Sequence, residues 1–465
     1  MYNEIIYGVC AVLCATLLAF AMTPIVRVFA VKIKAIDIPL DGRRMHHKPI
    51  PRTGGLAIFL SFLISTVGFC SMDKDLITIL VGGGTLVLLG VLDDVYRLNA
   101  FVKLAVQIVV ALFAVSQGVT IDFIGLGGSY IAFGAWSIPI TVLWIVGLTN
   151  AVNFIDGLDG LACGVSAICS VSLFLVMLLS GSSAAHCLIT GILAGACFGF
   201  LPFNMNPARI FMGDTGALFL GYTLSILSVV GIFKTDMILA FFIPLSIFGL
   251  PLADTAFAVI RRIAHKKSPF AADRGHLHHK LMDMGFGQKQ SVRILYAVCS
   301  ILGISAVMLT DESWFGGALV LISALVIFFI IFRILKNPKL RIHSGLYNED
   351  EGAVVPEETF EDVMTELEQQ ILESAELPDN SEETVLDSAI SQEKTVWSNE
   401  KCSGECLKNE DANAPSVGGS ELKDGERIGE EAYAQALRIM RDCGRVICCL
   451  KDEEFGEMND GNRRL

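Results

Sequence analysis

The stretch "IPITVLWIVGLTNAVNFIDGLDG" (residues 138–160) is an apolar segment that runs directly into a polar end. Residues 138–152 have the composition of a membrane-spanning helix, and Asn153, Asp156 and Asp159 follow them. Carboxylates at the edge of a bilayer are costly, and they commonly mark a functional site. The stretch therefore predicts a membrane helix that carries functional polar groups at one end.

Similar apolar segments recur through the first three quarters of the chain. The 465 residues are 53% hydrophobic and 18% charged, with a mean hydropathy of +0.58, which excludes a simple soluble domain. A helix needs about 17–25 apolar residues to cross a bilayer. We predict an all-α polytopic membrane protein with eleven spans, at residues 5–30, 54–70, 76–92, 101–118, 137–152, 160–180, 186–203, 216–233, 237–260, 291–310 and 313–334.

Two segments near the predicted spans need separate interpretation. Residues 121–139 are too rich in glycine and too broken to cross a membrane, so we predict an exposed hairpin loop. The first span follows Glu4 and no basic residue, which favours a retained anchor over a signal peptide.

The 13 cysteines lie mostly inside spans and predict no disulfide framework.

The chain changes charge near residue 350. Residues 351–465 hold 11 Lys and Arg against 29 Asp and Glu, whereas residues 1–350 hold 24 against 19. We predict a transmembrane domain at 1–340 and an acidic tail at 341–465, mostly disordered with short amphipathic helices. The tail cysteines fit no standard zinc module, although a zinc site there stays an alternative.

The basic residues of the membrane domain predict its orientation. Suppose that the N-terminus lies outside the cell and the chain crosses the membrane eleven times. Then 22 of the 24 Lys and Arg in residues 1–350 lie in cytoplasmic loops, and only Lys74 and Lys234 lie on the other side. We therefore expect a multi-pass protein of the cell membrane with its N-terminus outside and its tail in the cytoplasm.

Five polar loops fall on the same predicted cytoplasmic face. Each could simply cap a helix or form a solvated turn, but together they favour a functional site. Their carboxylates and amides suit a hard cation such as Mg²⁺, and their basic and imidazole groups suit a phosphate-bearing substrate. The loops are "DGRRMHHKPIPRTGG" (41–55), "DDVYRLN" (93–99), "NAVNFIDGLDG" (150–160), "NMNPARIFMGDTG" (204–216) and "DRGHLHHKL" (273–281).

These motifs resemble the polyprenyl-phosphate N-acetylhexosamine-1-phosphate transferase family, also called glycosyltransferase family 4. The likeness is greatest to its bacterial undecaprenyl-phosphate N-acetylglucosamine-1-phosphate transferases, and it covers roughly residues 5–335. The segments that carry it are "PIPRTGGLAI" (49–58), "GVLDDVYRLNA" (90–100), "NAVNFIDGLDGLA" (150–162), "FMGDTGALFLG" (211–221) and "PFAADRGHLHHKLMDMG" (269–285).

The resemblance implies an activity, a fold and partners. The reaction would transfer N-acetylglucosamine-1-phosphate from its UDP derivative to undecaprenyl phosphate, release UMP, and begin a cell-envelope glycan such as a teichoic acid or O-antigen. The implied cofactor is Mg²⁺, with Mn²⁺ as the alternative ion, and the implied fold is a membrane helix bundle with a cytoplasmic cleft. The expected partners are the UDP-sugar, undecaprenyl phosphate and the lipid bilayer, with no nucleic acid; a homodimer and downstream glycosyltransferases stay open.

The same resemblance implies roles for particular residues. Asn153 and Asp214 would be the magnesium ligands. The catalytic group would comprise Asp93, Asp94, Asp156, Asp159, His276, His278 and His279. The substrate-binding group would comprise His47, Lys48, Asn150 and Arg274.

The sequence differs from the pattern of many family members at two positions, so a second branch of the family stays an alternative. The acidic residue that many members carry shortly after the aspartate pair is absent, and Arg97 stands where the phospho-N-acetylmuramoyl-pentapeptide transferases have a lysine. Against that branch, Leu277 interrupts the run of histidines. A transporter is the more distant alternative, but it would place its polar groups at the bilayer midplane.

Overall fold

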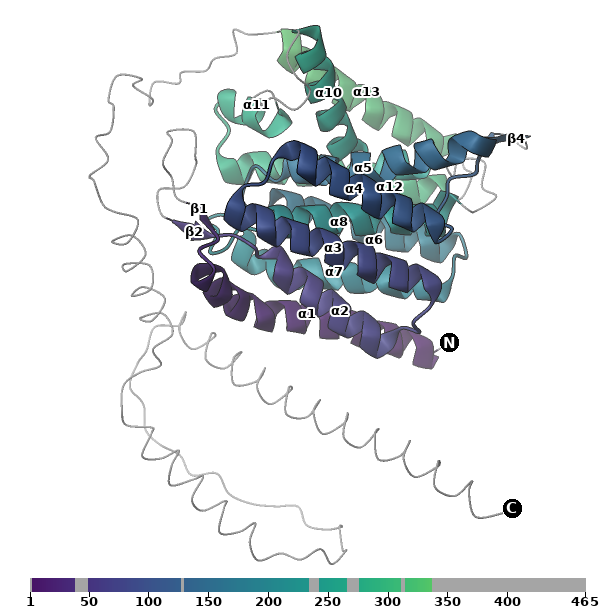
Figure 1. The fold of residues 1–465 in the computed structure, drawn as a ribbon. Coiled ribbons are helices and arrows are strands. Elements are labelled where there is room, and N and C mark those ends of the chain that lie inside the picture. Colours follow the sequence, from purple (N-terminus) through teal and green to yellow (C-terminus); the bar gives the residue numbers. More distant parts are fainter. Residues whose placement is uncertain are drawn as a thin grey trace, which may run out of the picture. The chain divides into compact units, whose positions relative to one another are not determined.

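The computed structural model describes residues 2–37, 49–126, 129–233, 242–265, 276–310 and 314–336 (Figure 1). Thirteen α-helices make up most of this part of the chain. They are α1 (Tyr2–Lys32), α2 (Gly55–Phe69), α3 (Lys74–Tyr96), α4 (Ala100–Ser116), α5 (Ser137–Ile155), α6 (Leu161–Leu179), α7 (Ala184–Asn204), α8 (Gly213–Ser228), α9 (Phe242–Ile247), α10 (Gly249–Ala264), α11 (Leu277–Asp283), α12 (Gln288–Leu309) and α13 (Trp314–Lys336).

The helices confirm a multi-pass membrane protein. Seven described helical segments are long and apolar enough to cross a bilayer, and α2, α4 and part of α13 are shorter apolar helices. Their bounds follow the predicted spans to within a few residues. Large apolar side chains such as Leu88, Val109 and Leu143 are exposed on the surface of the bundle, where lipid would cover them.

The predicted span at 237–260 is interrupted in its described part. The structure has two helices there, α9 and α10, separated at Phe248. Pro251 has no backbone N–H, so it cannot donate the helical hydrogen bond to the carbonyl of Ile247. The thiol of Cys169 donates to that carbonyl instead, at 3.3 Å.

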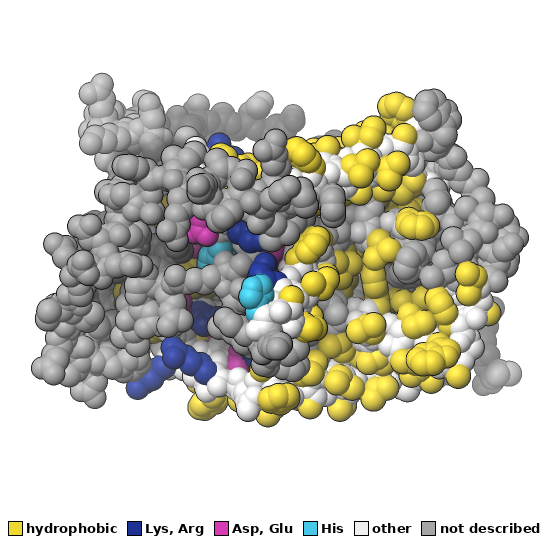
Figure 2. All heavy atoms as spheres, turned by 90° about the horizontal axis from the view of Figure 1, so that it is seen from above, with side chains coloured by type: hydrophobic (Ala, Val, Ile, Leu, Met, Phe, Trp, Pro, Cys, Tyr) yellow, Lys and Arg dark blue, Asp and Glu magenta, His cyan; other side chains and the backbone are white. Residues whose placement is uncertain are grey.

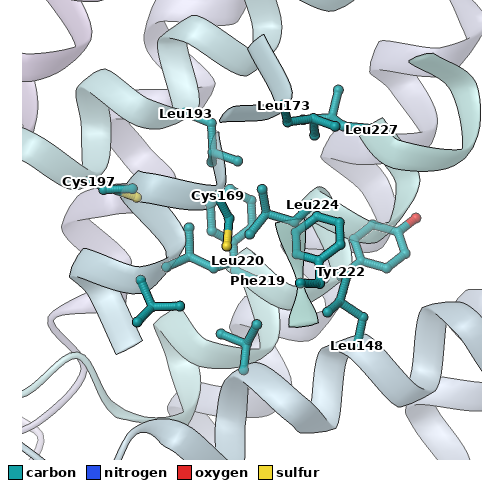
Figure 3. Close-up of a cluster of buried hydrophobic side chains, with 14 of the residues drawn as sticks. Leu148, Cys169, Leu173, Leu193, Cys197, Phe219, Leu220, Tyr222, Leu224 and Leu227 are labelled. Carbon is teal, nitrogen blue, oxygen red and sulfur yellow. The ribbon is translucent and has the colours of Figure 1, made fainter. Parts of the chain in front are cut away.

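Helix α8 forms the centre of the bundle. It is apolar on every side and packs against α2, α3, α5 and α6, so its spanning window is completely buried. Figure 3 shows Phe219, Leu220 and Leu224 of α8 among apolar side chains from neighbouring helices. Two polar contacts fix its rotation: Tyr222 Oη donates to the carbonyl of Thr78 at 3.0 Å, and Trp144 Nε1 donates to Ser228 Oγ at 3.0 Å. A π-helical turn, η2 (Val229–Phe233), continues the helix.

Two short antiparallel hairpins depart from the all-α prediction. Strands β1 (Ile36–Asp37) and β2 (Ile50–Pro51) pair beside the N-terminus of α2. Strands β3 (Phe123–Leu126) and β4 (Ser129–Ala132) pair before a single 3₁₀ turn, η1 (Gly134–Trp136), which leads into α5. The second hairpin confirms the loop predicted at 121–139.

Polar and charged side chains gather at one end of the bundle. In Figure 2 the blue, magenta and cyan side chains lie together, and hydrophobic side chains cover the described surface beyond them. Asp93 and Asp94 end α3 at this polar end. Asp75 lies at the other end of the same helix, and its Oδ2 is 3.0 Å from Nε2 of His186. A rise of 1.5 Å per residue separates Asp75 from Asp93 by about 27 Å.

Candidate active site

The carboxylate of Asp94 caps the N-terminus of α8. Its Oδ1 accepts the backbone N–H of Asp214 at 3.2 Å, and its Oδ2 accepts the hydroxyl of Thr215 at 2.7 Å and the backbone N–H of Thr215 at 3.4 Å. These bonds satisfy groups that the first turn of a helix leaves unpaired. Glycines permit the approach: a Cβ on Gly213, whose φ is +70°, would lie 2.4 Å from Asp94 Oδ2.

Lys103 lies between two of the predicted acidic site residues. Its Nζ is 2.9 Å from Oδ2 of Asp93 and 2.9 Å from Oδ2 of Asp214. The other oxygen of Asp93 accepts the backbone N–H of Leu98 at 2.7 Å. The structure thus brings Asp93 and Asp214, which are far apart in the sequence, to one position where a positive charge sits between them.

Arg52 adds a second positive charge to this group. Its Nε lies 3.5 Å from Oδ1 of Asp94, and its terminal nitrogens lie 4.0 Å from Asp214 and 3.9 Å from Asp37. Burial disfavours the charged guanidinium, but the surrounding carboxylates outweigh burial and raise the pKa of Arg52. Arg52 therefore stays charged beside the aspartates.

Lys103 and Arg52 belong to this group of charges, although the predicted site residues do not include them. Lys103 stands near the start of an apolar helix, where a basic residue also fits a role in membrane orientation. Arg52 lies inside the "PIPRTGG" motif (49–55), whereas the predicted substrate-binding residues His47 and Lys48 precede this motif. The one local signal for Lys103 is that it is the only charged residue in α4.

The end of α5 carries two predicted residues and brings Asp156 toward the same group. Asn153 and Asp156 lie at the last turn of the helix, and the backbone N–H of Asp156 donates to the carbonyl of Asn153 at 3.3 Å. Burial raises the pKa of Asp156 to about 7, and nearby carboxylates add to this effect, whereas Arg52 opposes it. Asp156 is therefore close enough to Arg52, Asp94 and Asp214 to interact with their charges.

Two other predicted residues make structural contacts. Oδ2 of Asp159 accepts Nδ2 of Asn206 at 2.8 Å and the backbone N–H of Ala208 at 3.0 Å, so Asp159 holds the loop that leads into α8. Asn150 donates from Nδ2 to Gln107 Oε1 at 2.5 Å and to the carbonyl of Val146 at 2.8 Å. Its amide nitrogen joins α5 to α4.

The histidines predicted at 276–279 lie together beside the end of α5. The rings of His276 and His278 are nearly parallel, with centroids 5.8 Å apart, and His279 lies 4.3 Å from His278. His278 packs against Gly157, where a Cβ would lie 2.4 Å from its Nε2. Burial lowers the pKa of His278 to about 3. The lowered pKa favours the neutral form of the ring near pH 7.

The remaining predicted positions, His47, Lys48 and Arg274, lie outside the described residues. Among the residues that the structure does describe, no group of three or more His, Cys, Asp or Glu side chains could by itself hold a metal ion. The donors at the polar end are mainly carboxylate and amide oxygens, which are the ligands of hard cations.

Comparisons with known proteins show which proteins the chain is similar to. Residues 76–232 match the model of glycosyl transferase family 4. A Bacillus subtilis (strain 168) protein named "probable undecaprenyl-phosphate N-acetylglucosaminyl 1-phosphate transferase" is 42% identical over 326 residues, which is 70% of this chain and 89% of the relative.

Two further relatives are similar to this chain at lower sequence identity. The undecaprenyl-phosphate alpha-N-acetylglucosaminyl 1-phosphate transferase of Thermotoga maritima is 34% identical, over 62% of this chain and 88% of its own. The phospho-N-acetylmuramoyl-pentapeptide-transferase of Bacillus cytotoxicus is 29% identical, over 62% of this chain and 94% of its own.

Proposed function

Since the chain belongs to glycosyl transferase family 4, we propose that it transfers N-acetylglucosamine-1-phosphate from UDP-N-acetylglucosamine to undecaprenyl phosphate. An oxygen of the lipid phosphate attacks the sugar-bearing phosphorus. The bond from that phosphorus to the bridging oxygen of the diphosphate breaks, and UMP leaves with that oxygen. The product is the lipid-linked first intermediate of a cell-envelope glycan.

The observation that carries this proposal is the group of charges at the ends of α3 and α8. Both reactants are anionic, and their repulsion grows as the site loses water. Transfer of a phosphoryl group depends mainly on alignment and on neutralising charge. Lys103 and Arg52 are held in place by Asp93, Asp94 and Asp214, and they supply fixed positive charge where two phosphates would meet.

A divalent cation fits this donor set. Asp214 and Asn153 would hold Mg²⁺, with substrate phosphates and water supplying the other ligands. The contact of the Lys103 ammonium with Asp93 and Asp214 supports the proposal, because two carboxylates already hold a cation at that position. When bound, Mg²⁺ would neutralise the diphosphate and polarise its oxygens.

The protein groups have separate roles in this mechanism. Asp93 aligns Lys103, because both its oxygens are engaged by protein donors. Asp94 fixes the first turn of α8 and with it the position of Asp214. Asp156, His276, His278 and His279 line the side where we expect the nucleotide sugar.

The location of the reaction follows from the charge distribution. We propose that the polar end faces the cytoplasm and that the N-terminus lies outside, because 22 of the 24 Lys and Arg in residues 1–350 fall in the loops of one side. Eleven crossings satisfy this arrangement if α9 and α10 count together as one. The acidic tail after residue 341 would then also be cytoplasmic.

A second branch of the same family is the alternative. It is supported by the likeness to the Bacillus cytotoxicus relative and by Arg97, but that relative is less similar than the Bacillus subtilis protein. A transporter is disfavoured because the described polar groups gather at one end of the bundle (Figure 2).

The test is release of UMP by the purified full-length protein in detergent with undecaprenyl phosphate and Mg²⁺. The protein is assayed with UDP-N-acetylglucosamine, its galactosamine epimer and UDP-N-acetylmuramoyl-pentapeptide. We expect turnover with the first, its loss on chelation and recovery when Mg²⁺ returns. Turnover confined to the muramoyl substrate would favour the alternative, and full activity under exhaustive chelation would exclude the metal site.

Asp214→Ala is the matching variant, with Asp75→Asn at the opposite end of the bundle as its control. We expect Asp214→Ala to lose activity and Asp75→Asn to keep it.

A further inference from the structure

A buried carboxylate on α10 binds the beginning of the histidine segment. Oδ2 of Asp254 lies 2.9 Å from Nδ1 of His276, and Oδ1 accepts the backbone N–H of Leu277 at 2.8 Å. Asp254 is 8% exposed and His276 is 7% exposed. One carboxylate therefore fixes both a side chain and the backbone at the point where α11 begins.

The same contact sets His276 against the end of α5. The ring of His276 lies 6.0 Å from the ring of Phe154, which stands in the sequence between Asn153 and Asp156. The ring of His276 also stacks on that of His278 at an interplanar angle of 10°. His278 in turn packs against Gly157. Asp254 thus controls how the histidine segment lies on the turn that carries the predicted nucleotide-side residues.

The contact also determines which nitrogen of His276 remains available. An ionised carboxylate can only accept a hydrogen bond, so Nδ1 must carry the proton that it shares with Asp254. Among the described residues, the bond to Asp254 is the hydrogen bond of this ring. Nε2 is therefore the nitrogen left to contact a substrate. Partners of this kind orient catalytic histidines in many enzymes.

We propose that Asp254 is a positioning residue, which holds His276 so that Nε2 faces the nucleotide sugar. This inference rests on the proposed function, since it takes His276 to contact the substrate. Asp254 itself acts through the ring. A purely structural carboxylate in the same place would stabilise α10 and α11 without any dependence on His276.

The chain provides a matched control for this pair. Asp75 and His186 form a similar carboxylate–histidine contact at 3.0 Å, but at the opposite end of α3 and α7. Asp75→Asn removes one carboxylate charge from that pair, as Asp254→Asn does here. We expect Asp75→Asn to leave UMP release unchanged.

The experiment is a double-mutant cycle on UMP release by the full-length protein. Asparagine at 254 has one acceptor oxygen in place of two, so it cannot hold Nδ1 and Leu277 as before. We expect Asp254→Asn to lower kcat about tenfold to a hundredfold, with KM for the nucleotide sugar changed less than kcat. His276→Asn keeps an amide donor near the position of Nδ1 and loses Nε2. In that background, Asp254→Asn should have little further effect, because coupled residues are not additive.

Three outcomes are decisive. If Asp254→Asn lowers kcat by the same factor in the wild-type and His276→Asn proteins, the inference is wrong. It is also wrong if Asp254→Asn alone releases UMP at the wild-type rate. A wild type that releases no UMP refutes the proposed function instead. If Asp254→Asn is not recovered from membranes, Asp254→Glu, which displaces both acceptor oxygens by one methylene, is measured in the same cycle with the same expectation.

Discussion

The hydroxyl of Thr215 donates to the carboxylate of Asp94 at 2.7 Å, across 121 residues of sequence. The contact joins the last turn of α3 to the first turn of α8. A Cβ on Gly90 would lie 2.4 Å from the backbone of Thr215, so the two helices approach closely just there. The position of Asp214 therefore depends on a helix other than its own.

Thr215→Val tests the stabilising effect of this bond. A hydrogen bond to a charged group contributes about 2 kcal/mol, so we expect a lower melting temperature in detergent and a reduced rate of UMP release. Thr85→Val on α3 is the control, because its hydroxyl bonds only to the carbonyl of Val81 on an exposed face. Equal melting temperatures for the two variants would contradict the assignment.

Asp93→Asn distinguishes an aligning role from a general base. Oδ1 and Oδ2 of Asp93 both accept hydrogen bonds from the protein, which favours alignment. The second pKa of a phosphate monoester is near 6, so the lipid needs little help to lose its proton at neutral pH. We expect turnover to fall by a similar factor from pH 6 to pH 9. A loss that shrinks as the pH rises would identify Asp93 as a base.

Gly157→Ala should displace the histidine segment and leave the fold intact. The added Cβ would lie 2.4 Å from Nε2 of His278, so the ring must move. Misplacement of about 1 Å can lower a rate about a hundredfold, and we expect kcat to fall by at least ten times. Gly147→Ala is the control, since its Cβ would meet no atom within 4 Å. The assay compares UMP release and the amount of folded protein for both variants.

Asp156 should make the stability of the Mg²⁺-free protein depend on pH. Burial raises its pKa from 3.8 to about 7, so between these values the folded chain binds more protons at this position than the unfolded chain. The contribution of Asp156 to the free energy of unfolding therefore decreases as the pH rises from about 4 to 7, and then becomes constant.

Asp156→Asn should remove this dependence. We expect the melting temperature of the wild type, relative to the variant, to fall between pH 5.5 and pH 7.5 in the presence of a chelator. If the difference in melting temperature between the wild type and Asp156→Asn stays constant across that pH range, Asp156 has no raised pKa in the folded protein.

Much of the architecture could be predicted from hydropathy alone. A bilayer requires about 20 apolar residues per helix, and it requires backbone groups to pair within the helix, so each span has a sequence signal of its own. The segment at 138–160 shows how far this extends, since it predicted both α5 and the polar turn that follows. The break between α9 and α10 was missed, because Cys169, which satisfies the carbonyl freed by Pro251, comes from another helix.

The sequence by itself determined the membrane helices and the gathering of Asp93, Asp94, Asp156 and Asp214 at one end of the bundle. Only the tertiary structure decided which side chain each carboxylate meets: Lys103 for Asp93 and Asp214, Arg52 for Asp94, and His276 for Asp254. The physical reason is that hydropathy depends on the local residues, whereas these contacts depend on how helices distant in the sequence rotate and pack. A lysine at the start of an apolar helix gives no sign of the two aspartates that it will join.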